Sequence, residues 1–79
     1  MNVKQLKTAL VRFDNNKCYL VSKCGNWSVA RGGYDLFCEV YYCGNWIASI
    51  TCNGSIYDID VVNTPEKAQV YDIIRNWLG

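Results

Sequence analysis

The sequence predicts a two-layer α+β domain in which a five-stranded antiparallel meander sheet carries an N-terminal and a C-terminal helix on one face. Three observations lead to this fold class. Apolar residues recur at helical spacing near both ends of the chain, the middle is rich in β-branched and aromatic residues, and short turn dipeptides divide that middle into strands. The predicted order is helix, five strands, helix, in one domain spanning residues 1–79.

The first helix is predicted over residues 2–13. One apolar stripe with a period of 3.6 residues is formed by Val3, Leu6, Leu10 and Phe13. The sequence Asp14-Asn15-Asn16 then supplies a stop and a turn.

Four dipeptides typical of tight hairpin turns divide the middle of the chain. They are Gly25-Asn26, Gly32-Gly33, Gly44-Asn45 and Asn53-Gly54. Such pairs tolerate the positive φ angles that type I′ and II′ turns require. The expected strands cover residues 18–24, 27–31, 34–42, 46–52 and 55–62. No connection is long enough for a crossover, so each strand must pair with its sequence neighbour and a parallel sheet is excluded.

The tetrapeptide Cys24-Gly25-Asn26-Trp27 recurs as Cys43-Gly44-Asn45-Trp46. We interpret this as one good hairpin turn used twice, because a solenoid or a propeller needs more copies at a fixed period. In both copies the Trp follows the turn directly, and it is expected to cover the end of the sheet.

The segment Thr64-Pro65-Glu66 predicts the start of the second helix. Thr64 suits the N-cap, Pro65 suits the first helical position, and Glu66 suits the positive end of the helix dipole. Helical spacing then relates Val70, Ile73, Ile74 and Trp77. Both helices are expected to cover the same face of the sheet.

Strands bury alternate residues, and each strand is assigned the face that keeps its acidic residues outside the core. The first three strands then contribute Cys18, Leu20, Trp27, Val29, Leu36, Cys38, Val40 and Tyr42, and the last two contribute Trp46, Ala48, Ile50, Tyr57, Ile59 and Val61. Strict two-residue turns throughout would place these two sets on opposite faces. We therefore expect a three-residue loop or a bulge at Cys43-Gly44-Asn45.

The face away from the helices is predicted to keep six apolar side chains, namely Tyr19, Val21, Phe37, Tyr41, Ile47 and Ile56. A contiguous patch of this kind marks a binding or dimer surface. Surface apolar residues that are merely scattered need no such explanation, and both interpretations stay open. The first strand is also a short edge without proline, so pairing from edge to edge is a further alternative.

The residue types needed for catalysis are mostly missing. The chain contains five cysteines and no histidine, which excludes imidazole acid–base chemistry and Ser-His triads. No Cys precedes a predicted helix, and the Cys-x-x-Cys spacing is absent. Asp58 and Asp60 share one strand face, but two carboxylates without a third ligand make a poor metal site. We therefore expect no enzymatic activity, no metal and no cofactor.

The cysteine count and the apolar runs bear on the compartment. An odd number of cysteines cannot all pair within the chain, so free and mostly buried thiols in a reducing cytosol are expected rather than a disulfide framework. No apolar run has the length of a signal-peptide core or a membrane span. A cytoplasmic protein without membrane contact is the expectation.

The formal net charge of +1 conceals an uneven distribution. Residues 1–31 contain six of the eight basic residues and one acidic residue, whereas residues 32–79 contain two basic and six acidic residues. A nucleic-acid-binding module would use Lys4, Lys7, Arg12 and Lys23 beside aromatic strands. The same charges also fit the solvated face of a helix or a complementary protein partner.

The segment from Met1-Asn2-Val3-Lys4-Gln5-Leu6 through Phe13-Asp14-Asn15-Asn16 is a helix leading by an Asp/Asn turn into a strand. It resembles the start of short proteins of phages and prophages of Gram-positive bacteria. The resemblance implies a small accessory protein of a mobile element that binds a host or phage protein. Inhibitors of bacterial defence systems, including anti-CRISPR proteins, are similar in size and in their lack of catalytic machinery. Many of those are strongly acidic DNA mimics, and this chain is not.

The predicted function is a non-enzymatic protein-interaction module that occludes or bridges a partner through the uncovered sheet face or a sheet edge. The alternative is a nucleic-acid-binding module, which titrations at two salt concentrations decide because phosphate contacts weaken steeply with salt. A third hypothesis is a homodimer that buries the uncovered face against itself.

Overall fold

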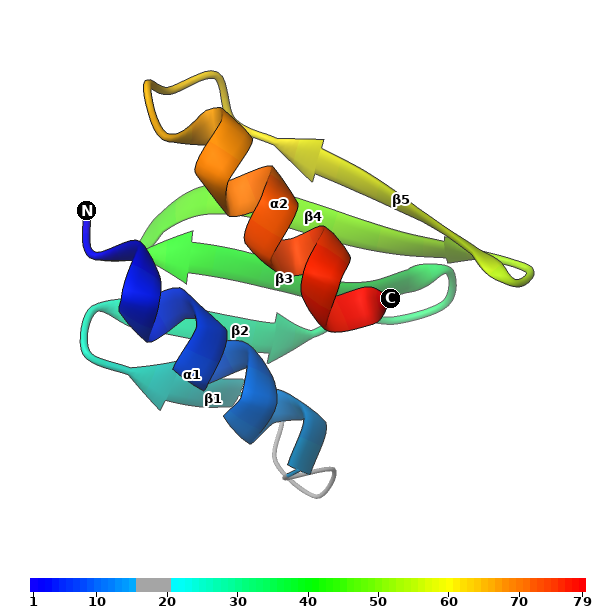
Figure 1. Cartoon of the computed structure of the whole chain (residues 1–79). Coiled ribbons are helices and arrows are strands. Elements are labelled where there is room, and N and C mark those ends of the chain that lie inside the picture. The colour runs from blue at the N-terminus through cyan, green and yellow to red at the C-terminus, as the bar shows by residue number, and fades with distance from the viewer. Residues whose placement is uncertain (16–20) are drawn as a thin grey trace.

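The computed structural model describes residues 1–15 and 21–79. Its two helices and its five-stranded antiparallel sheet, with the strands side by side in sequence order, confirm the predicted α+β fold (Figure 1). The elements in chain order are α1 (Val3–Asn15), β1 (Val21–Cys24), β2 (Trp27–Arg31), β3 (Leu36–Tyr42), β4 (Asn45–Asn53), β5 (Ile56–Val61) and α2 (Lys67–Leu78). The start predicted for the first strand, including Cys18 and Leu20, lies outside the described residues.

Both helices lie on the same face of the sheet, as the sequence predicts (Figure 1). α1 packs on β1 and β2, α2 packs on β5, and the two helices contact each other. No element of the described chain covers the opposite face. Neither described helix is long and apolar enough to cross a membrane.

The N-terminal helix follows its apolar stripe. Leu6, Leu10 and Phe13 are buried, together with Ala9 between them. The side-chain oxygen of Asn2 accepts the backbone N–H of Lys4 at 3.1 Å, which satisfies one of the free donors of the first turn. The carbonyl of Asn2 accepts the indole N–H of Trp27 at 2.7 Å, so the start of α1 is tied to β2.

The C-terminal helix buries Val70 and Ile74, but its predicted cap is wrong. The helix begins at Lys67 without a side-chain cap, and Thr64 is instead part of a preceding turn in which its carbonyl accepts the N–H of Lys67 at 3.1 Å. This turn redirects the chain from β5 onto the helix layer before the helix can start. Its Glu66 carboxylate lies 3.7 Å from the Met1 ammonium group.

The two copies of the repeated tetrapeptide form different turns. In the first copy the turn is Gly25-Asn26, with φ of 60° at the glycine, and Trp27 is the first residue of β2. In the second copy the turn is Cys43-Gly44, with φ of 51° and 80°, so Asn45 begins β4 and Trp46 is second. Type I′ turns require positive φ at both central residues, and the second copy meets this requirement. Trp27 pairs with Tyr42 and Trp46 pairs with Tyr41, and because neighbouring residues of a strand point to opposite faces, the two Trp side chains lie on opposite faces of the sheet.

Two bulges in the β3–β4 pair replace the irregularity predicted at Cys43-Gly44-Asn45. The loop there has only two residues, and the extra residue that restores the alternation is Ile47, between the pairs Val40–Ala48 and Tyr41–Trp46. The second extra residue is Phe37, between the pairs Leu36–Thr51 and Cys38–Ile50. A bulge turns two successive residues toward similar directions, so these insertions change which side chains reach the core.

Two other turns also differ from the prediction. The predicted Gly32-Gly33 turn is a longer loop, in which the N–H of Leu36 donates to the Gly33 carbonyl at 3.0 Å. A Cβ at position 32 would meet the backbone oxygen of Leu36, so glycine is needed at this close approach. The last hairpin turns at Gly54-Ser55, one residue later than predicted.

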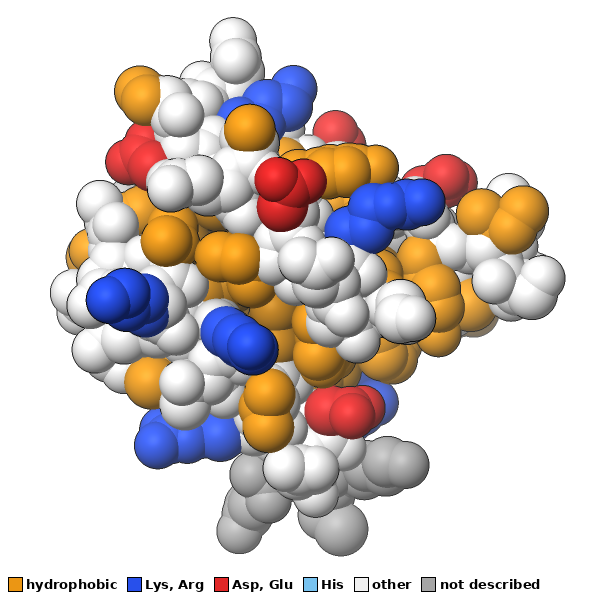
Figure 2. Space-filling view, viewed as in Figure 1, with side chains coloured by type: hydrophobic (Ala, Val, Ile, Leu, Met, Phe, Trp, Pro, Cys, Tyr) orange, Lys and Arg blue, Asp and Glu red, His pale blue; other side chains and the backbone are white. Residues whose placement is uncertain are grey.

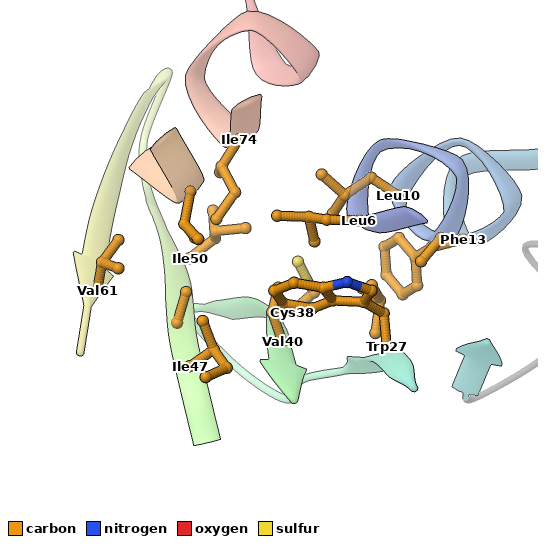
Figure 3. Close-up of a cluster of buried hydrophobic side chains, with 14 residues drawn as sticks. Leu6, Leu10, Phe13, Trp27, Cys38, Val40, Ile47, Ile50, Val61 and Ile74 are labelled. Carbon is orange, nitrogen blue, oxygen red and sulfur yellow. The ribbon is translucent and has the colours of Figure 1, made fainter. Parts of the chain in front are cut away.

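The core lies between the sheet and the two helices (Figure 3). Leu6 and Leu10 of α1 lie above the flat Trp27 ring, with Val40 on its sheet side. Ile74 of α2 is above Ile50, and Cys38 fills the space between these two groups. Most described strand residues predicted for the core are buried or packed against it, but Leu36, Trp46 and Tyr57 are not members of this cluster, and Trp46 and Tyr57 are each 37% exposed.

Candidate interaction surface

The side of the sheet opposite the helices is the candidate functional surface. The side chains on this side follow from the alternation along each strand, starting from the buried residues and allowing for one extra residue at each bulge. From β1 to β5 they are Val21 and Lys23, Ser28 and Ala30, Glu39 and Tyr41, Trp46, Ser49 and Thr51, and Ile56, Asp58 and Asp60. We call this surface the outer face.

Two aromatic side chains lie opposite each other on the outer face, next to the turn between β3 and β4. Tyr41 of β3 and Trp46 of β4 are directly opposite each other in the strand register. Trp46 is 37% exposed, and Tyr41 is half-buried. A pair of large rings at this position offers a flat apolar surface to a partner, and Tyr and Trp are the residues most enriched at binding hot spots.

A hydrogen-bonded chain fixes the Trp46 ring beside a carboxylate. The indole N–H of Trp46 donates to the Ser49 hydroxyl at 2.8 Å, and this hydroxyl donates to a Glu39 carboxylate oxygen at 3.3 Å. The Trp46 indole and the Ser49 hydroxyl therefore each have an acceptor, and the chain of hydrogen bonds ends at the Glu39 carboxylate. The arrangement combines a preoriented aromatic ring with a negative group, which suits a cationic side chain of a partner.

Charge changes sign across the outer face. Asp58 and Asp60 of β5 are exposed, and they lie opposite Thr51 and Ser49 of β4. Lys23 is on β1, at the other edge of the sheet. The acidic residues that the alternation placed outside the core are therefore outside, and they gather toward β5.

Only part of the predicted apolar patch is found on the outer face. Val21, Tyr41 and Ile56 lie there, on β1, β3 and β5 respectively, and Ile56 is 67% exposed. Tyr19 lies outside the described residues. Ile47 was expected on this face, but its bulge places it in the buried cluster with 6% exposure.

Phe37 was also expected on the outer face, and this expectation is wrong. Its ring stacks on Trp77 of α2 at 5.9 Å between centroids and meets Phe13 of α1 edge-on at 5.7 Å. A third ring, Tyr57 of β5, lies 5.5 Å away. The Arg31 guanidinium covers Phe13 at 4.6 Å from its centroid. The Phe37 bulge therefore serves the core between both helices.

Sequence reasoning missed Trp46 as a functional candidate. Alternation with Ala48 and Ile50 favoured a core position for it, because the irregularity was expected before Trp46, at Cys43-Gly44-Asn45. The extra residue is instead Ile47, which follows Trp46, so Ala48 and Ile50 reach the core while Trp46 stays on the outer face.

The basic residues of the nucleic-acid hypothesis are on the helix side. Lys4 and Lys7 are exposed on α1, and basic side chains are visible over this helix in Figure 2. The Arg12 guanidinium donates to the Lys23 carbonyl at 2.8 Å, which brings the end of α1 against β1. Tyr41 and Trp46 lie on the other side of the sheet, so α1 and these rings do not form one surface.

The described cysteines are free thiols: Cys24, Cys38, Cys43 and Cys52. Cys38 is fully buried, and this burial raises the pKa of its thiol from the ordinary 9.0 to about 12. Arg31 acts in the opposite direction and lowers the pKa, while Glu39 raises it. The thiol is neutral at physiological pH and acts as a small core residue.

The free energy of unfolding should fall as the pH rises from about 9 toward 12, because the unfolded chain releases the Cys38 proton first. This single group contributes a slope of up to about 1.4 kcal/mol per pH unit. Cys38→Ala lacks this titrating thiol, so its free energy of unfolding does not contain this pH-dependent contribution. The difference in free energy of unfolding between the unsubstituted protein and Cys38→Ala should therefore become smaller as the pH rises above 9. Urea unfolding under reducing conditions at several pH values measures it. A difference that stays constant above pH 9 contradicts the expectation.

Comparison of the chain with protein-family models, curated proteins and solved structures finds no match. Among the residues described, no three His, Cys, Asp or Glu side chains are grouped as metal ligands would be. The outer face therefore has to be interpreted from its own rings, charges and hydrogen bonds.

Proposed function

We propose that this chain is a non-enzymatic protein-interaction module that binds a partner protein through the outer face. The observation that carries the proposal is the Tyr41–Trp46 pair, which lies on a sheet face left open by both helices. The sequence resemblance to phage accessory proteins directs the search for the partner to proteins of a bacterial host, including its defence systems. Occlusion of a functional surface on that partner is the proposed mode of action in the host cytoplasm.

The size of the outer face fits a small but specific interface. The molecule measures 30 × 24 × 21 Å along its principal axes. Its broad side is then close to the roughly 800 Å² that each partner contributes to a standard interface. Affinity in such interfaces comes from a few central side chains surrounded by polar groups that exclude water. Tyr41 and Trp46 supply the anchors, and Glu39, Ser49 and Thr51 supply the polar surroundings.

The distribution of charge favours a protein partner over a nucleic acid on this face. Glu39, Asp58 and Asp60 would repel phosphates, and base stacking needs aromatic rings beside basic groups. A nucleic acid would instead have to bind α1 through Lys4 and Lys7, where the Tyr41 and Trp46 rings are out of reach. A cationic protein surface matches both the rings and the carboxylates.

Tyr41→Asp should abolish capture of the partner, because a carboxylate at the centre of the interface must be desolvated without a matching group. The expected loss is at least about 2 kcal/mol of binding free energy, or about thirtyfold in Kd. The measurement is a pull-down from host lysate with mass spectrometry, followed by calorimetric titration of the purified partner. Circular dichroism verifies that the variant is folded.

Tyr71→Asp is the matched control, since Tyr71 is equally a surface tyrosine, 37% exposed, but lies on α2. Capture should survive this substitution. The opposite pattern, with capture lost only in Tyr71→Asp, would assign binding to the helix layer and refute the proposal. Sedimentation over a range of concentrations identifies the case in which the captured protein is a second copy of the chain.

A further inference from the structure

The two edges of the sheet differ in how accessible their backbone is. At the β1 edge, the carbonyl of Lys23 accepts a hydrogen bond from the Arg12 guanidinium at 2.8 Å. This side chain occupies an acceptor that an added strand would need. β5 forms the other edge, and among the described strands it pairs with β4 alone. An uncovered edge strand is a template for pairing with another chain.

The hydrogen-bonding pattern identifies which groups of β5 are available. The N–H of Val62 donates to the Ile47 carbonyl at 2.8 Å. Because antiparallel pairs alternate between bonded and non-bonded residues, Asp60 and Asp58 also direct their backbone groups to β4. The two-residue turn agrees with this pattern, because the residues that flank such a turn, here Asn53 and Ile56, form a hydrogen-bonded pair. The backbone groups of Tyr57 and Ile59 therefore point away from the sheet, toward any strand that pairs with this edge.

A hollow lies on the helix side of this edge, next to these outward groups. It has a volume of about 320 Å³ and is lined by Ser55, Ile56, Tyr57, Ile59, Arg75, Leu78 and Gly79. Figure 2 shows hydrophobic side chains between α2 and the projecting β4–β5 hairpin. In an antiparallel pair, directly opposite residues point to the same side of the sheet. Partner side chains opposite Tyr57 and Ile59 would therefore enter this hollow, where Leu78 offers apolar contact.

The charges of β5 determine which strand can pair with it. Two copies pairing antiparallel about Ile59 would place Asp58 of one copy opposite Asp60 of the other, on the same face. Like charges in directly opposite positions are destabilising, so this register is disfavoured between two copies. Lys or Arg at the same positions of a different strand would instead form favourable pairs with both carboxylates.

We propose that β5 binds an extended segment of a partner protein as a sixth, antiparallel strand. The segment has apolar residues at alternate positions, which fill the hollow beside α2, and Lys or Arg at the intervening positions, which face Asp58 and Asp60. This inference rests on the proposed function and names the element through which the partner is bound. Backbone hydrogen bonds provide the affinity, and the alternating side chains provide the specificity.

The probe for this site is the blocked synthetic peptide Thr-Lys-Val-Lys-Val-Lys-Thr, added to the full-length protein labelled with ¹⁵N. Binding should shift the amide resonances of β5 and slow hydrogen exchange at Tyr57 and Ile59, whose N–H groups become bonded. A peptide with Glu in place of Lys should bind at least about tenfold more weakly, because it faces two carboxylates. The double variant D58N/D60N should reduce the difference between these two peptides.

Two N-methylated forms of the Lys peptide separate strand addition from simple charge attraction. Methylation of the Val amides removes the donors that face β5 and should weaken binding at least about tenfold. Methylation of the Lys amides, which face solvent, should change Kd by less than about threefold. Equal effects of the two methylations, shifts confined to other strands, or no binding of the parent peptide would each overturn the inference.

The outcomes also distinguish this inference from the function on which it rests. Loss of peptide binding in a protein that still captures its partner in a Tyr41-dependent manner refutes strand addition and leaves the outer face as the interface. Retained peptide binding with Tyr41-independent capture supports the edge and removes the central role of the outer-face rings.

Discussion

Replacing Trp27 by alanine is expected to lower the free energy of unfolding by about 3–5 kcal/mol. The side chain is completely buried between α1 and the sheet, packs against the tilted Tyr42 ring at 4.8 Å between centroids, and donates its indole N–H to the Asn2 carbonyl. Truncation of a buried Trp costs about 3–5 kcal/mol. A chain of 79 residues has a total stability of about 4–12 kcal/mol. The substitution therefore removes a large share of the free energy of unfolding, which urea denaturation followed by circular dichroism measures.

The control for this prediction comes from the same sequence motif. Trp46 occupies the equivalent place in the second Cys-Gly-Asn-Trp copy, but it is on the outer face with 37% exposure. Trp46→Ala should lower the stability by no more than about 1 kcal/mol, chiefly through loss of its hydrogen bond to Ser49. Similar losses for both substitutions would mean that the two Trp residues share one environment, contrary to the register of the two hairpins.

Phe37→Ala is the second substitution with a large expected effect, about 2–4 kcal/mol of lost stability. The ring lies within 6 Å of those of Phe13, Trp77 and Tyr57, so its removal opens a cavity where both helices meet the sheet. The same urea titration measures the loss. Tyr34→Ala, at a fully exposed ring in the neighbouring loop, should leave stability within about 0.5 kcal/mol. If Phe37→Ala left the stability unchanged, the Phe37 ring would have to lie on the outer face, as the strand alternation predicted.

The order of the elements follows from local signals in the sequence. Each helix has an apolar stripe of its own, and each hairpin has a glycine at or next to its turn, so these features are decided within a few residues. The assignment of Asp58 and Asp60 to the outer face is similarly local, because an acidic residue is costly in a core. Val21, Tyr41 and Ile56 were placed correctly for the same reason of strand alternation.

The phase of the fourth strand is decided by interactions that are remote in sequence. A turn at Gly44-Asn45 would repeat the first hairpin, whereas a turn at Cys43-Gly44 requires positive φ at a cysteine, which costs about 1 kcal/mol or more. The bulge at Ile47 resets the alternation, so Ile47 and Ala48 are both buried, and the burial of Ile47 is worth about 2 kcal/mol. The free energy gained by burying Ile47 depends on contacts with β3, β5 and the helix layer, so the residue preferences of a turn dipeptide cannot predict it.

The Phe37 bulge has a similar origin. Alternation along the third strand directs this ring to the outer face, and only the three rings contributed by α1, α2 and β5 create a better environment on the other side. These partners are separated from Phe37 by at least twenty residues. The sequence therefore predicted that Asp58, Asp60 and Tyr41 lie on the outer face. It did not predict that Trp46 lies there.

The bond between Arg12 and the Lys23 carbonyl has a consequence for stoichiometry. A sheet that can be extended from both ends behaves as a monomer with two reactive ends, and successive additions produce fibres. Because Arg12 occupies an acceptor at the β1 edge, the strand addition that we propose at β5 would extend the sheet at one end only. The expected product is a finite complex of one chain with one partner segment.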